Sequence, residues 1–592
     1  MAKLVKWMKS CKFAIINTIK ACKYLLLYHF GFEIIITTLA YLDLYSLNLL
    51  LSKLELHTKF HECVHLILIM ILLQALTIII PVLNMRISKK MEFNSKCYID
   101  DWYYKKIIKL PLSVTDSVEG RNQIERVSNR KGDVYGLYET IIELIISLYS
   151  LSIAIITFVN YNALYALIFF IITLPGTISK YYNTMMYDKF EKKNLANRRY
   201  HSYYRWILTA QQTAKDVRMY TLTDDIKKQY YKKRKKYLKE KRKLFSLTLK
   251  IDTFFKLLEQ VGLCFFIITL INDKLNNVIN IGELVMFVGI AVAYIDALRS
   301  SANNFDNIIY FSNSVADMLD FENISCFEEH SGNKKITDFR SLEFKNVSFK
   351  YPGNDEYILK DLSFRINKGE KIVIIGINGS GKTTIVKIML GLYQLNSGSI
   401  LINDENINNY CIDDVRKLFS VLFQDFLSYP LTIKENVVLS NIENINDDYH
   451  IEFALKQSGS NDFLQGVSLD RHITREFDDE GIELSKGQKQ KLALARTYFK
   501  KSPILIFDEP SAALDVEAEN HVFNSFETLP GNTTGIMITH RIVNLKDSRI
   551  LVLNNGYIAE SGTHQQLLDK NGIYAHMYLL QKKKYKLEGK TQ

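Results

Sequence analysis

The sequence contains few of the residues that interrupt helices or cross-link secreted domains. Its 592 residues include only 8 prolines, 26 glycines and 3 tryptophans. Cysteines are present, but they form no close pair and do not have the spacing of metal ligands. We therefore expect reduced thiols that pack among other side chains, at positions Cys11, Cys22, Cys63, Cys97, Cys264, Cys326 and Cys411.

Acidic residues are missing from the chain before Glu33, although lysines recur there. The apolar stretch that follows is too long for a cleavable signal peptide, and no small-residue cleavage site comes after it. The lysine spacing predicts an amphipathic helix over residues 1–23 that lies at a membrane interface. A flexible basic tail is the alternative.

The net charge of +12 is compatible with binding to nucleic acid or to an anionic membrane. Because the basic residues cluster beside apolar segments, they favour the membrane surface. No nucleic-acid partner is expected.

Long apolar runs are confined to the first half of the chain. Six of them can cross a bilayer core, which takes about 20 apolar residues in a helix. The fold class predicted for residues 24–310 is a membrane α-helical domain of six long transmembrane helices. Its spans are placed near 24–50, 63–85, 135–159, 162–186, 250–272 and 281–305.

The connections between these spans differ in length and charge. Spans three and four are separated only by Asn160–Asn162, which predicts a hairpin, whereas the connections at about 86–134 and 187–249 are long and basic. The positive-inside rule places both long connections and both termini in the cytoplasm, with the chain in a bacterial plasma membrane. Short cross-piece helices are expected within 110–127 and 213–229, with solvated loops as the alternative.

The second half of the chain predicts an α/β domain over residues 341–580, after a linker at 311–340 and before a basic tail at 581–592. Within it, "GINGSGKT" from Gly376 follows an apolar strand and precedes an apolar helix. This order is that of a P-loop, whose backbone N–H groups and helix N-terminus bind phosphates. The predicted ATP-binding residues of this segment are Asn378, Gly379, Ser380, Gly381, Lys382, Thr383 and Thr384.

A second apolar run, Ile504–Phe507, ends in Asp508 and Glu509. Beside a P-loop, such a strand end supplies one carboxylate that holds Mg²⁺, here Asp508, together with the hydroxyl of Thr383. The next carboxylate, Glu509, orients or deprotonates an attacking water. ATP and Mg²⁺ are therefore the expected ligands.

The order of "SKGQ" from Ser485, "FDEP" from Phe507, "SAALD" from Ser511 and "ITHR" from Ile538 resembles the ATP-binding cassette (ABC) family. With six spans before one cassette, the whole chain resembles a half-size ABC exporter with a domain-swapped membrane domain. The resemblance implies that Tyr351 stacks on adenine. It also implies that Gln424 contacts Mg²⁺ or the attacking water, and that His540 holds the γ-phosphate.

The same resemblance implies a homodimer with two ATP molecules between its cassettes. Ser485, Gly487 and Gln488 would then meet the γ-phosphate bound to the opposite copy, and Asp515 would communicate between the copies. Lys486 stands where the family usually has glycine. The features that matter for binding phosphate are kept around it: the hydroxyl of Ser485, the closely approaching backbone at Gly487 and the start of a helix. We therefore predict a working ATP site. A degenerate site in a heterodimer is the alternative.

An acidic loop precedes this signature turn. Exporters of the family usually carry a Thr-Glu-Val-Gly-Glu type of loop there, and this sequence departs from that pattern. We expect its acids to meet Arg or Lys at the cytoplasmic tips of the membrane helices: Glu476, Asp478, Asp479 and Glu480.

The segments "EGIELSKGQKQKLALARTYF" and "AKDVRMYTL" resemble bacterial peptide exporters, including those for lantibiotics and other bacteriocins. This resemblance implies ATP-driven export of a peptide from the cytoplasm. A lipid or multidrug exporter and a regulatory membrane protein are the alternatives. Because the first span begins near residue 24, we expect no N-terminal protease domain, and another protein would remove any leader peptide.

Ionisable side chains inside spans are costly unless they face a cavity or a partner. The sequence pairs Glu259 with Lys256, and Asp296 with Arg299. The remaining acids predict a cavity suited to a cationic peptide, because they lack an obvious local partner: Glu33, Asp43 and Glu143.

Overall fold

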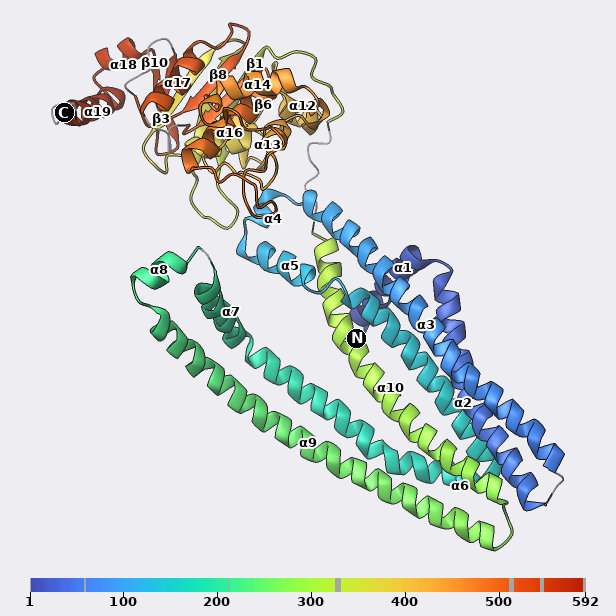
Figure 1. Cartoon of the computed structure of the whole chain (residues 1–592). Coiled ribbons are helices and arrows are strands. Elements are labelled where there is room, and N and C mark those ends of the chain that lie inside the picture. Colours follow the sequence, from blue (N-terminus) through green and yellow to red (C-terminus); the bar gives the residue numbers. More distant parts are fainter. Residues whose placement is uncertain are drawn as a thin grey trace. The chain divides into compact units, whose positions relative to one another are not determined.

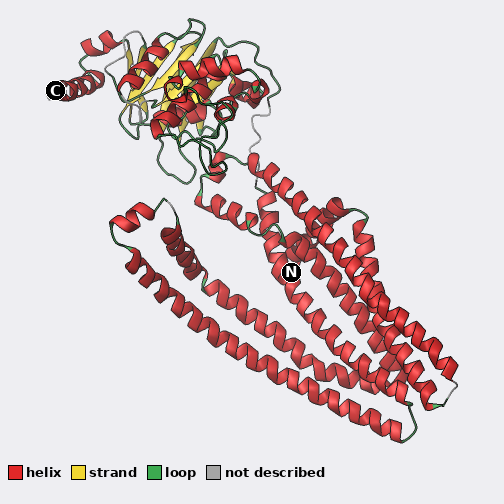
Figure 2. Ribbon diagram, in the orientation of Figure 1, coloured by secondary structure: helices red, strands yellow, loops and turns green. Residues whose placement is uncertain are grey.

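The computed structural model describes residues 2–57, 60–210, 212–324, 332–510, 516–542 and 548–588. The chain forms two compact units, one of helices only and one of mixed α/β structure (Figure 2). The helical unit comprises residues 1–108 and 122–324, and the α/β unit comprises residues 109–121 and 325–592. A short piece of the first long connection therefore packs with the α/β unit.

The helical unit is built from long helices because its apolar runs contain almost no helix breakers. Within the described residues, 5 helical segments are long and apolar enough to cross a membrane. They are α2 (Leu25–Glu55), α3 (Phe60–Ile108), the Asp133–Ala163 part of α6 (Asp133–Lys193), α9 (Thr223–Leu275) and α10 (Ile281–Glu322).

The α6 helix is interrupted at Asn162, whose backbone is extended (φ −160°, ψ 110°). The interruption lies between the predicted third and fourth spans, and the chain reverses direction there (Figure 1). Many side chains of the predicted span 162–186 lie outside the described set. Figure 1 shows the second half of α6 and α9 as a long pair that diverges from the other helices of the unit.

An aromatic cluster joins α6, α9 and α10. Phe158 is fully buried, and its ring lies 5.7 Å from that of Phe266 and 6.3 Å from that of Tyr294. These edge-on contacts add to the attraction between the helices, which matters in a bilayer because lipid is as apolar as the helices themselves.

The N-terminal helix α1 (Ala2–Cys22) packs against the helical unit. Ser10 Oγ donates to the carbonyl of Ser312 on α10 (3.0 Å), and Lys6 Nζ lies 2.9 Å from Asp320 Oδ2. Ala14 is fully buried. The flexible-tail alternative is therefore wrong, while the position of α1 at a membrane interface stays a prediction.

The remaining helices of this unit form the long connections: α5 (Val118–Ser128), α7 (Leu195–Thr209) and α8 (Ala214–Met219). The solvated-loop alternative is wrong for the second connection, because α8 lies inside the predicted cross-piece 213–229.

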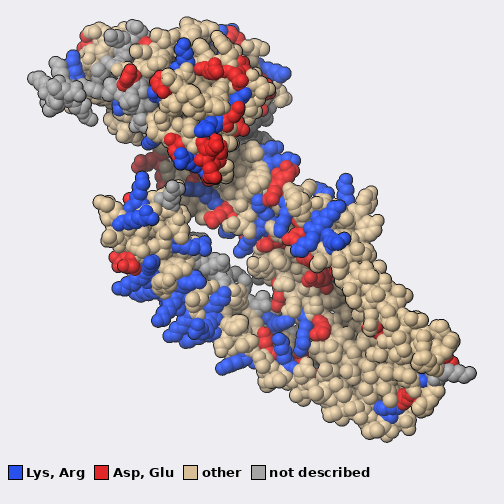
Figure 3. Space-filling model, viewed as in Figure 1, with Lys and Arg blue, Asp and Glu red and all other residues tan. Residues whose placement is uncertain are grey.

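Lys and Arg gather over α9 near α7 and α8, whereas much of the bundle surface farther along α2 and α3 is uncharged (Figure 3). This distribution is typical of a domain that crosses a membrane.

Two of the expected charge arrangements are wrong. The sequence pairs Glu259 with Lys256, but in the structure the buried Glu259 carboxylate accepts a hydrogen bond from Arg299 Nε (3.0 Å). Glu33 has a partner after all, because Asn84 Nδ2 donates to its Oε1 (2.6 Å). Both pairs join side chains of different helices, so sequence spacing does not reveal them.

The α/β unit has two sheets. A mostly parallel sheet has the order β10-β9-β3-β8-β7-β6, in which only β10 is antiparallel to its neighbour. Its strands are β3 (Lys371–Gly376), β6 (Phe419–Leu422), β7 (Ile504–Asp508), β8 (Thr534–Ile538), β9 (Arg549–Asn554) and β10 (Tyr557–Gly562). The second sheet is antiparallel and consists of β1 (Ser341–Phe349), β2 (Leu359–Asn367), β4 (Ser397–Ile402) and β5 (Glu405–Asn406).

The described residues of this unit form three apolar clusters, one of which includes residues of both sheets. Helices surround the sheets (Figure 2). They are α11 (Lys382–Met389), α12 (Ile412–Lys417), α13 (Ile433–Val438), α14 (Asp448–Gln457), α15 (Asn461–Leu464), α16 (Lys486–Phe499), α17 (Val516–Glu527), α18 (His564–Asp569) and α19 (Ile573–Glu588), with the 3₁₀ turns Ile407–Asn409 and Ile442–Asn444.

Two predicted boundaries need correction. The sequence predicts a linker at 311–340, but α10 continues to Glu322, since this segment contains no helix breaker. The sequence predicts a basic tail at 581–592, but α19 continues to Glu588. In the first connection, α4 (Leu112–Thr115) lies within the predicted cross-piece 110–127, where the solvated-loop alternative is also wrong.

The pairing of Arg299 with Glu259 predicts how this region responds to substitution. Arg299→Met should lower the unfolding temperature in detergent strongly, because it leaves a buried carboxylate without a partner. Glu259→Gln should have a smaller effect, since an amide still accepts a hydrogen bond. Asp296→Asn is the matched control, because Asp296 is exposed and 3.8 Å from Arg299. Equal melting temperatures for Arg299→Met and Asp296→Asn would contradict the pairing.

Candidate functional site

The loop between β3 and α11 is shaped by glycines. Gly379 and Gly381 have φ values of +82° and +103°, which side chains rarely allow. A Cβ on Gly376 would lie 2.4 Å from the carbonyl oxygen of Leu553 on the neighbouring strand. The loop can therefore turn tightly from the strand and direct backbone N–H groups and the start of α11 at a phosphate.

Lys382 lies over this loop. Its Nζ donates to the carbonyls of Gly376 (3.0 Å) and Ile377 (3.2 Å), and the residue is buried. Burial lowers the pKa of Lys382, against the opposing effect of the nearby carboxylates Glu509 and Asp508. A phosphate would give this ammonium a stronger, charged acceptor than the two carbonyls.

Asp508 lies at the end of β7, fully buried, opposite the P-loop. Thr383 Oγ1 donates to its Oδ1 (3.3 Å), while Oδ2 is buried and has no hydrogen-bond partner within the described residues. Burial raises the pKa of Asp508 to about 6. The Thr383 hydroxyl and the buried Asp508 carboxylate are suitable ligands for Mg²⁺, because this ion prefers oxygen ligands. When bound with ATP, that ion neutralises phosphate charge.

Glu509 follows in a left-handed conformation, with φ +49°. Such backbone is uncommon for a residue with a side chain and persists only where the surroundings enforce it. Here the Glu509 N–H donates to the carbonyl of Ile538 (2.9 Å). The conformation turns the Glu509 side chain out of the strand, toward two other predicted catalytic residues.

Those residues are Gln424 and His540. Gln424 Nε2 donates to Glu509 Oε2 (2.8 Å), and His540 Nδ1 lies 3.9 Å from Glu509 Oε1. An amide, a carboxylate and an imidazole thus converge from three separate segments of the chain. Their individual roles in catalysis stay predictions.

A cavity of about 500 Å³ encloses this cluster. Its lining includes most of the P-loop residues predicted to bind ATP and also residues that sequence reasoning missed, Ile358, Met577 and Gln581. The predicted members are Asn378, Gly379, Gly381, Lys382, Thr383, Thr384, Gln424, Glu509 and His540. Ser380 lies inside the same loop, and its buried Oγ has no hydrogen-bond partner in the part of the chain that the structure describes.

Tyr351 lies beside this cavity and is not part of its lining. Its hydroxyl shares a hydrogen bond with Thr384 Oγ1 (3.2 Å), and its ring packs edge-on against Tyr393 (5.2 Å between centroids). Stacking of Tyr351 on adenine therefore stays a prediction.

The signature turn begins α16. Ser485 Oγ accepts from the N–H of Gln488 (3.3 Å), and Gln488 Oε1 accepts from the N–H of Ser485 (2.8 Å), which makes a capping box. Lys486 is the first helical residue, has no positive φ and is exposed. Ser485, Gly487 and Gln488 do not line the 500 Å³ cavity of their own chain. Asp515, the remaining predicted contact, lies outside the described residues.

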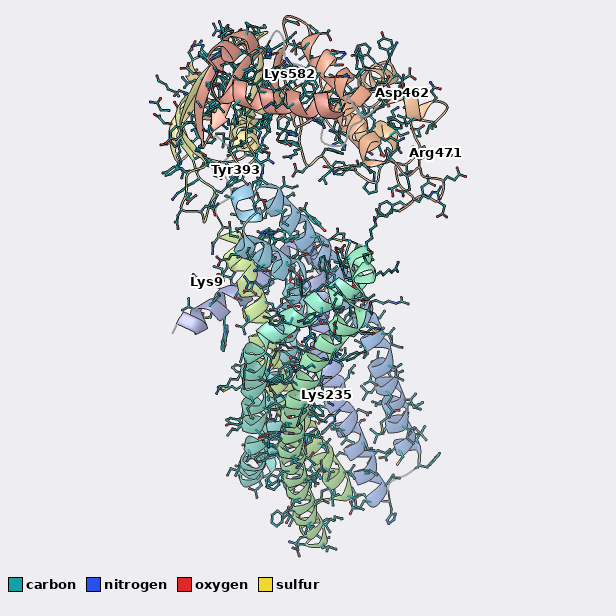
Figure 4. The ribbon with its side chains drawn as sticks, turned by 90° about the vertical axis from the view of Figure 1, so that its left-hand side faces the viewer. Lys9, Lys235, Tyr393, Asp462, Arg471 and Lys582 are labelled. Atoms are coloured by element: carbon teal, nitrogen blue, oxygen red, sulfur yellow. The ribbon has the colours of Figure 1, made fainter. Side chains whose placement is uncertain are left out.

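The acidic loop before this turn already has partners within the α/β unit. Arg471 Nη2 lies 3.1 Å from Glu480 Oε2, and His472 Nδ1 lies 3.2 Å from Asp478 Oδ2. Arg471 is labelled in Figure 4, at the edge of the unit. The contact of these acids with the membrane helices stays a prediction, for which the exposed Glu476 and Asp479 are the better candidates.

Comparison with known proteins agrees with this geometry. A family model described as "ABC transporter" matches residues 359–512. The chain is 29% identical over 489 residues to the subtilin transport ATP-binding protein SpaT of Bacillus subtilis, covering 80% of this chain and 78% of that protein. It is 33% identical over 302 residues to an ATP-dependent lipid A-core flippase of Methylobacillus flagellatus, covering 50% and 51%.

A solved structure extends the likeness to both units. The fold matches that of a bacterial Atm1-family ABC exporter with ATP bound, with a TM-score of 0.74 and 19% identity. The match covers 96% of this chain and 98% of that chain. Each unit thus has the fold of the matching part of a known exporter.

The site predicts different effects for its two charged centres. Glu509→Gln should abolish ATP hydrolysis but retain ATP binding, because the amide keeps the size and loses the basic oxygen. Lys382→Ala should weaken ATP binding itself, since it removes the phosphate-facing ammonium. Filter binding of radiolabelled ATP and phosphate release would separate the two. Normal hydrolysis by Glu509→Gln would remove Glu509 from the role of base.

Lys486 should tolerate replacement, because its side chain is exposed on the first turn of α16. Lys486→Gly should keep the rate of ATP hydrolysis within about threefold, as surface changes usually have small effects. Ser485→Ala is the contrasting variant, since it removes the helix cap. A large loss with Lys486→Gly would show that the lysine contacts nucleotide or a partner.

Proposed function

The chain belongs to the ABC transporter family and couples ATP hydrolysis to transport across a membrane, and from this premise we propose that its cargo is a peptide. We further propose that the chain works as a homodimer, with its cassette and both termini in the cytoplasm. Export then follows alternating access, in which ATP binding and hydrolysis change the side of the membrane to which the cargo cavity opens.

The observation that carries the peptide proposal is the extent of the likeness to SpaT. It spans most of both proteins, including the membrane unit that contacts the cargo. The likeness to the lipid A-core flippase spans half of each chain. Cargo recognition resides in the membrane unit, so similarity that extends beyond the cassette favours a peptide over a lipid.

The dimer proposal is supported by the position of the signature turn. Ser485 and Gly487 present a hydroxyl and backbone N–H groups at a helix start, which suit an anion. They do not line the cavity of their own chain, so a second copy is needed to bring such a turn to the P-loop.

Two exposed acids on the helical unit support a cationic cargo. Glu143 on α6 and Asp296 on α10 are both exposed in the single chain, although they lie within predicted spans. Asp296 also lies 3.8 Å from Arg299, but that guanidinium is shared with the buried Glu259. Carboxylates at such depth normally face a water-filled cavity or a partner. Glu33 differs, since Asn84 satisfies it inside the helical unit.

The helical unit has a cavity that these acids do not line. It has a volume of about 560 Å³, and Lys180, Asn183 and Asp252 contribute to its wall. Glu33, Asp43 and Glu143 do not line it. An acidic cavity around Glu143 and Asp296 would therefore form only with the second copy or in another state of the transport cycle.

The cargo proposal predicts charge selection by the exposed acids. In vesicles containing the purified protein, Glu143→Gln and Asp296→Asn should slow ATP-dependent transport of a cationic peptide more than of its neutral analogue. Glu33→Gln is the matched control, because its carboxylate is hydrogen-bonded within the unit. ATP hydrolysis without peptide should be unchanged.

Equal transport of both peptides by every variant would reject charge selection. Wild-type ATP hydrolysis stimulated by lipid or by many unrelated dyes, and not by peptides, would reject a peptide cargo and favour the lipid or multidrug alternative.

A further inference from the structure

One side chain of the C-terminal helix is bonded to the backbone on both sides of His540. Gln581 Nε2 donates to the carbonyl of His540, and Gln581 Oε1 accepts from the N–H of Ile542 (2.9 Å). A single amide thus bridges an acceptor and a donor of the loop that carries the imidazole. We propose that Gln581 is a positioning residue for ATP hydrolysis, which holds His540 at the reacting phosphate.

The loop after β8 needs such a support. Its first residue, Thr539, is tied to β3 through an N–H bond to Ile374 O (3.2 Å), and Thr539 Oγ1 accepts from the N–H of Arg541 (3.0 Å). Beyond Thr539 no strand continues to hold the backbone in the described part of the chain. The carbonyl of His540 and the N–H of Ile542 would lose their partners if Gln581 were absent.

The imidazole itself has little other restraint. Its side chain is 48% exposed, and its Nδ1 lies 3.9 Å from Glu509 Oε1, beyond hydrogen-bond distance. Its direction therefore depends on the backbone of the loop. Small errors in the placement of a catalytic group reduce rates strongly, so a support for this backbone bears on hydrolysis.

Gln581 is well placed to give that support because α19 is anchored to the unit. Glu560 accepts from the N–H groups of Ile573 (2.6 Å) and Tyr574 (3.1 Å), the first residues of α19. Tyr574 is fully buried, and its hydroxyl bonds to His564 Nδ1. The helix start is thus held by a carboxylate and by a buried ring.

The side of α19 that carries the buried Tyr574 also carries residues that line the nucleotide cavity. Tyr574, Met577 and Gln581 recur three and four residues apart, which puts them on one side of a helix. Met577 and Gln581 line the nucleotide cavity. Lys582, labelled on α19 in Figure 4, is the next residue and is exposed. The role of Gln581 concerns ATP hydrolysis and does not depend on which molecule the protein transports.

The test uses the full-length protein in lipid nanodiscs. Gln581→Leu keeps the size of the side chain and removes both hydrogen bonds, and it should lower kcat about tenfold with KM for ATP within about twofold. Gln581→Glu should also lower kcat, because a carboxylate cannot donate to the His540 carbonyl. Lys583→Gln, an exposed change on the same helix, is the matched control and should keep the wild-type rate.

A double-variant cycle separates positioning from general stability. If Gln581 acts through His540, adding Gln581→Leu to His540→Ala should cause no further loss in single-turnover hydrolysis. An equal loss in both backgrounds would overturn the proposal, as would a raised KM with normal kcat. A fall of the unfolding temperature that accounts for the lost activity would also overturn it, as would wild-type kcat in both Gln581 variants.

Discussion

A buried carboxylate that faces a phosphate-binding loop is the constraint on which the cassette depends. Asp508 is fully buried, and one of its oxygens has no hydrogen-bond partner among the residues that the structure describes. Burying such a group is unfavourable unless a cation or a hydrogen bond compensates. Asp508 is buried because β7 is an interior strand, paired with β6 and β8 and buried along its whole length, and its end places Asp508 and Glu509 beside the P-loop. The backbone strain at Glu509 is part of the same arrangement.

Contacts lead outward from this pocket in two directions. On one side, the ring of Tyr351 packs on Tyr393, whose hydroxyl bonds to Asp116, the residue after α4. Tyr393 is labelled in Figure 4. Because α4 belongs to the short piece of the first long connection, residues 109–121, that packs with the α/β unit, this path stays within that unit. On the other side, Gln581 connects α19 with His540.

The sequence predicts the parts of the site that depend on contiguous residues. The P-loop, the strand end at Asp508 and the capped turn at Ser485 each have a local pattern with a physical reason. Contacts between distant segments are different, because they depend on how helices are rotated against each other. The sequence places Gln581 in a basic tail, and the partner of Glu259 lies 40 residues away at Arg299. Neither has a signal in a single sequence.

We propose that each chain holds half of each nucleotide site. It can be tested by co-purifying two differently tagged chains that both carry Glu509→Gln, one with Lys382→Ala and the other with Gly487→Asp. Each chain alone should fail to trap ATP. In the mixed dimer the intact P-loop of one copy meets the intact signature turn of the other, so trapped ATP should be recovered with doubly tagged protein. Trapping by the Gly487→Asp chain alone, with no gain on mixing, would contradict the claim.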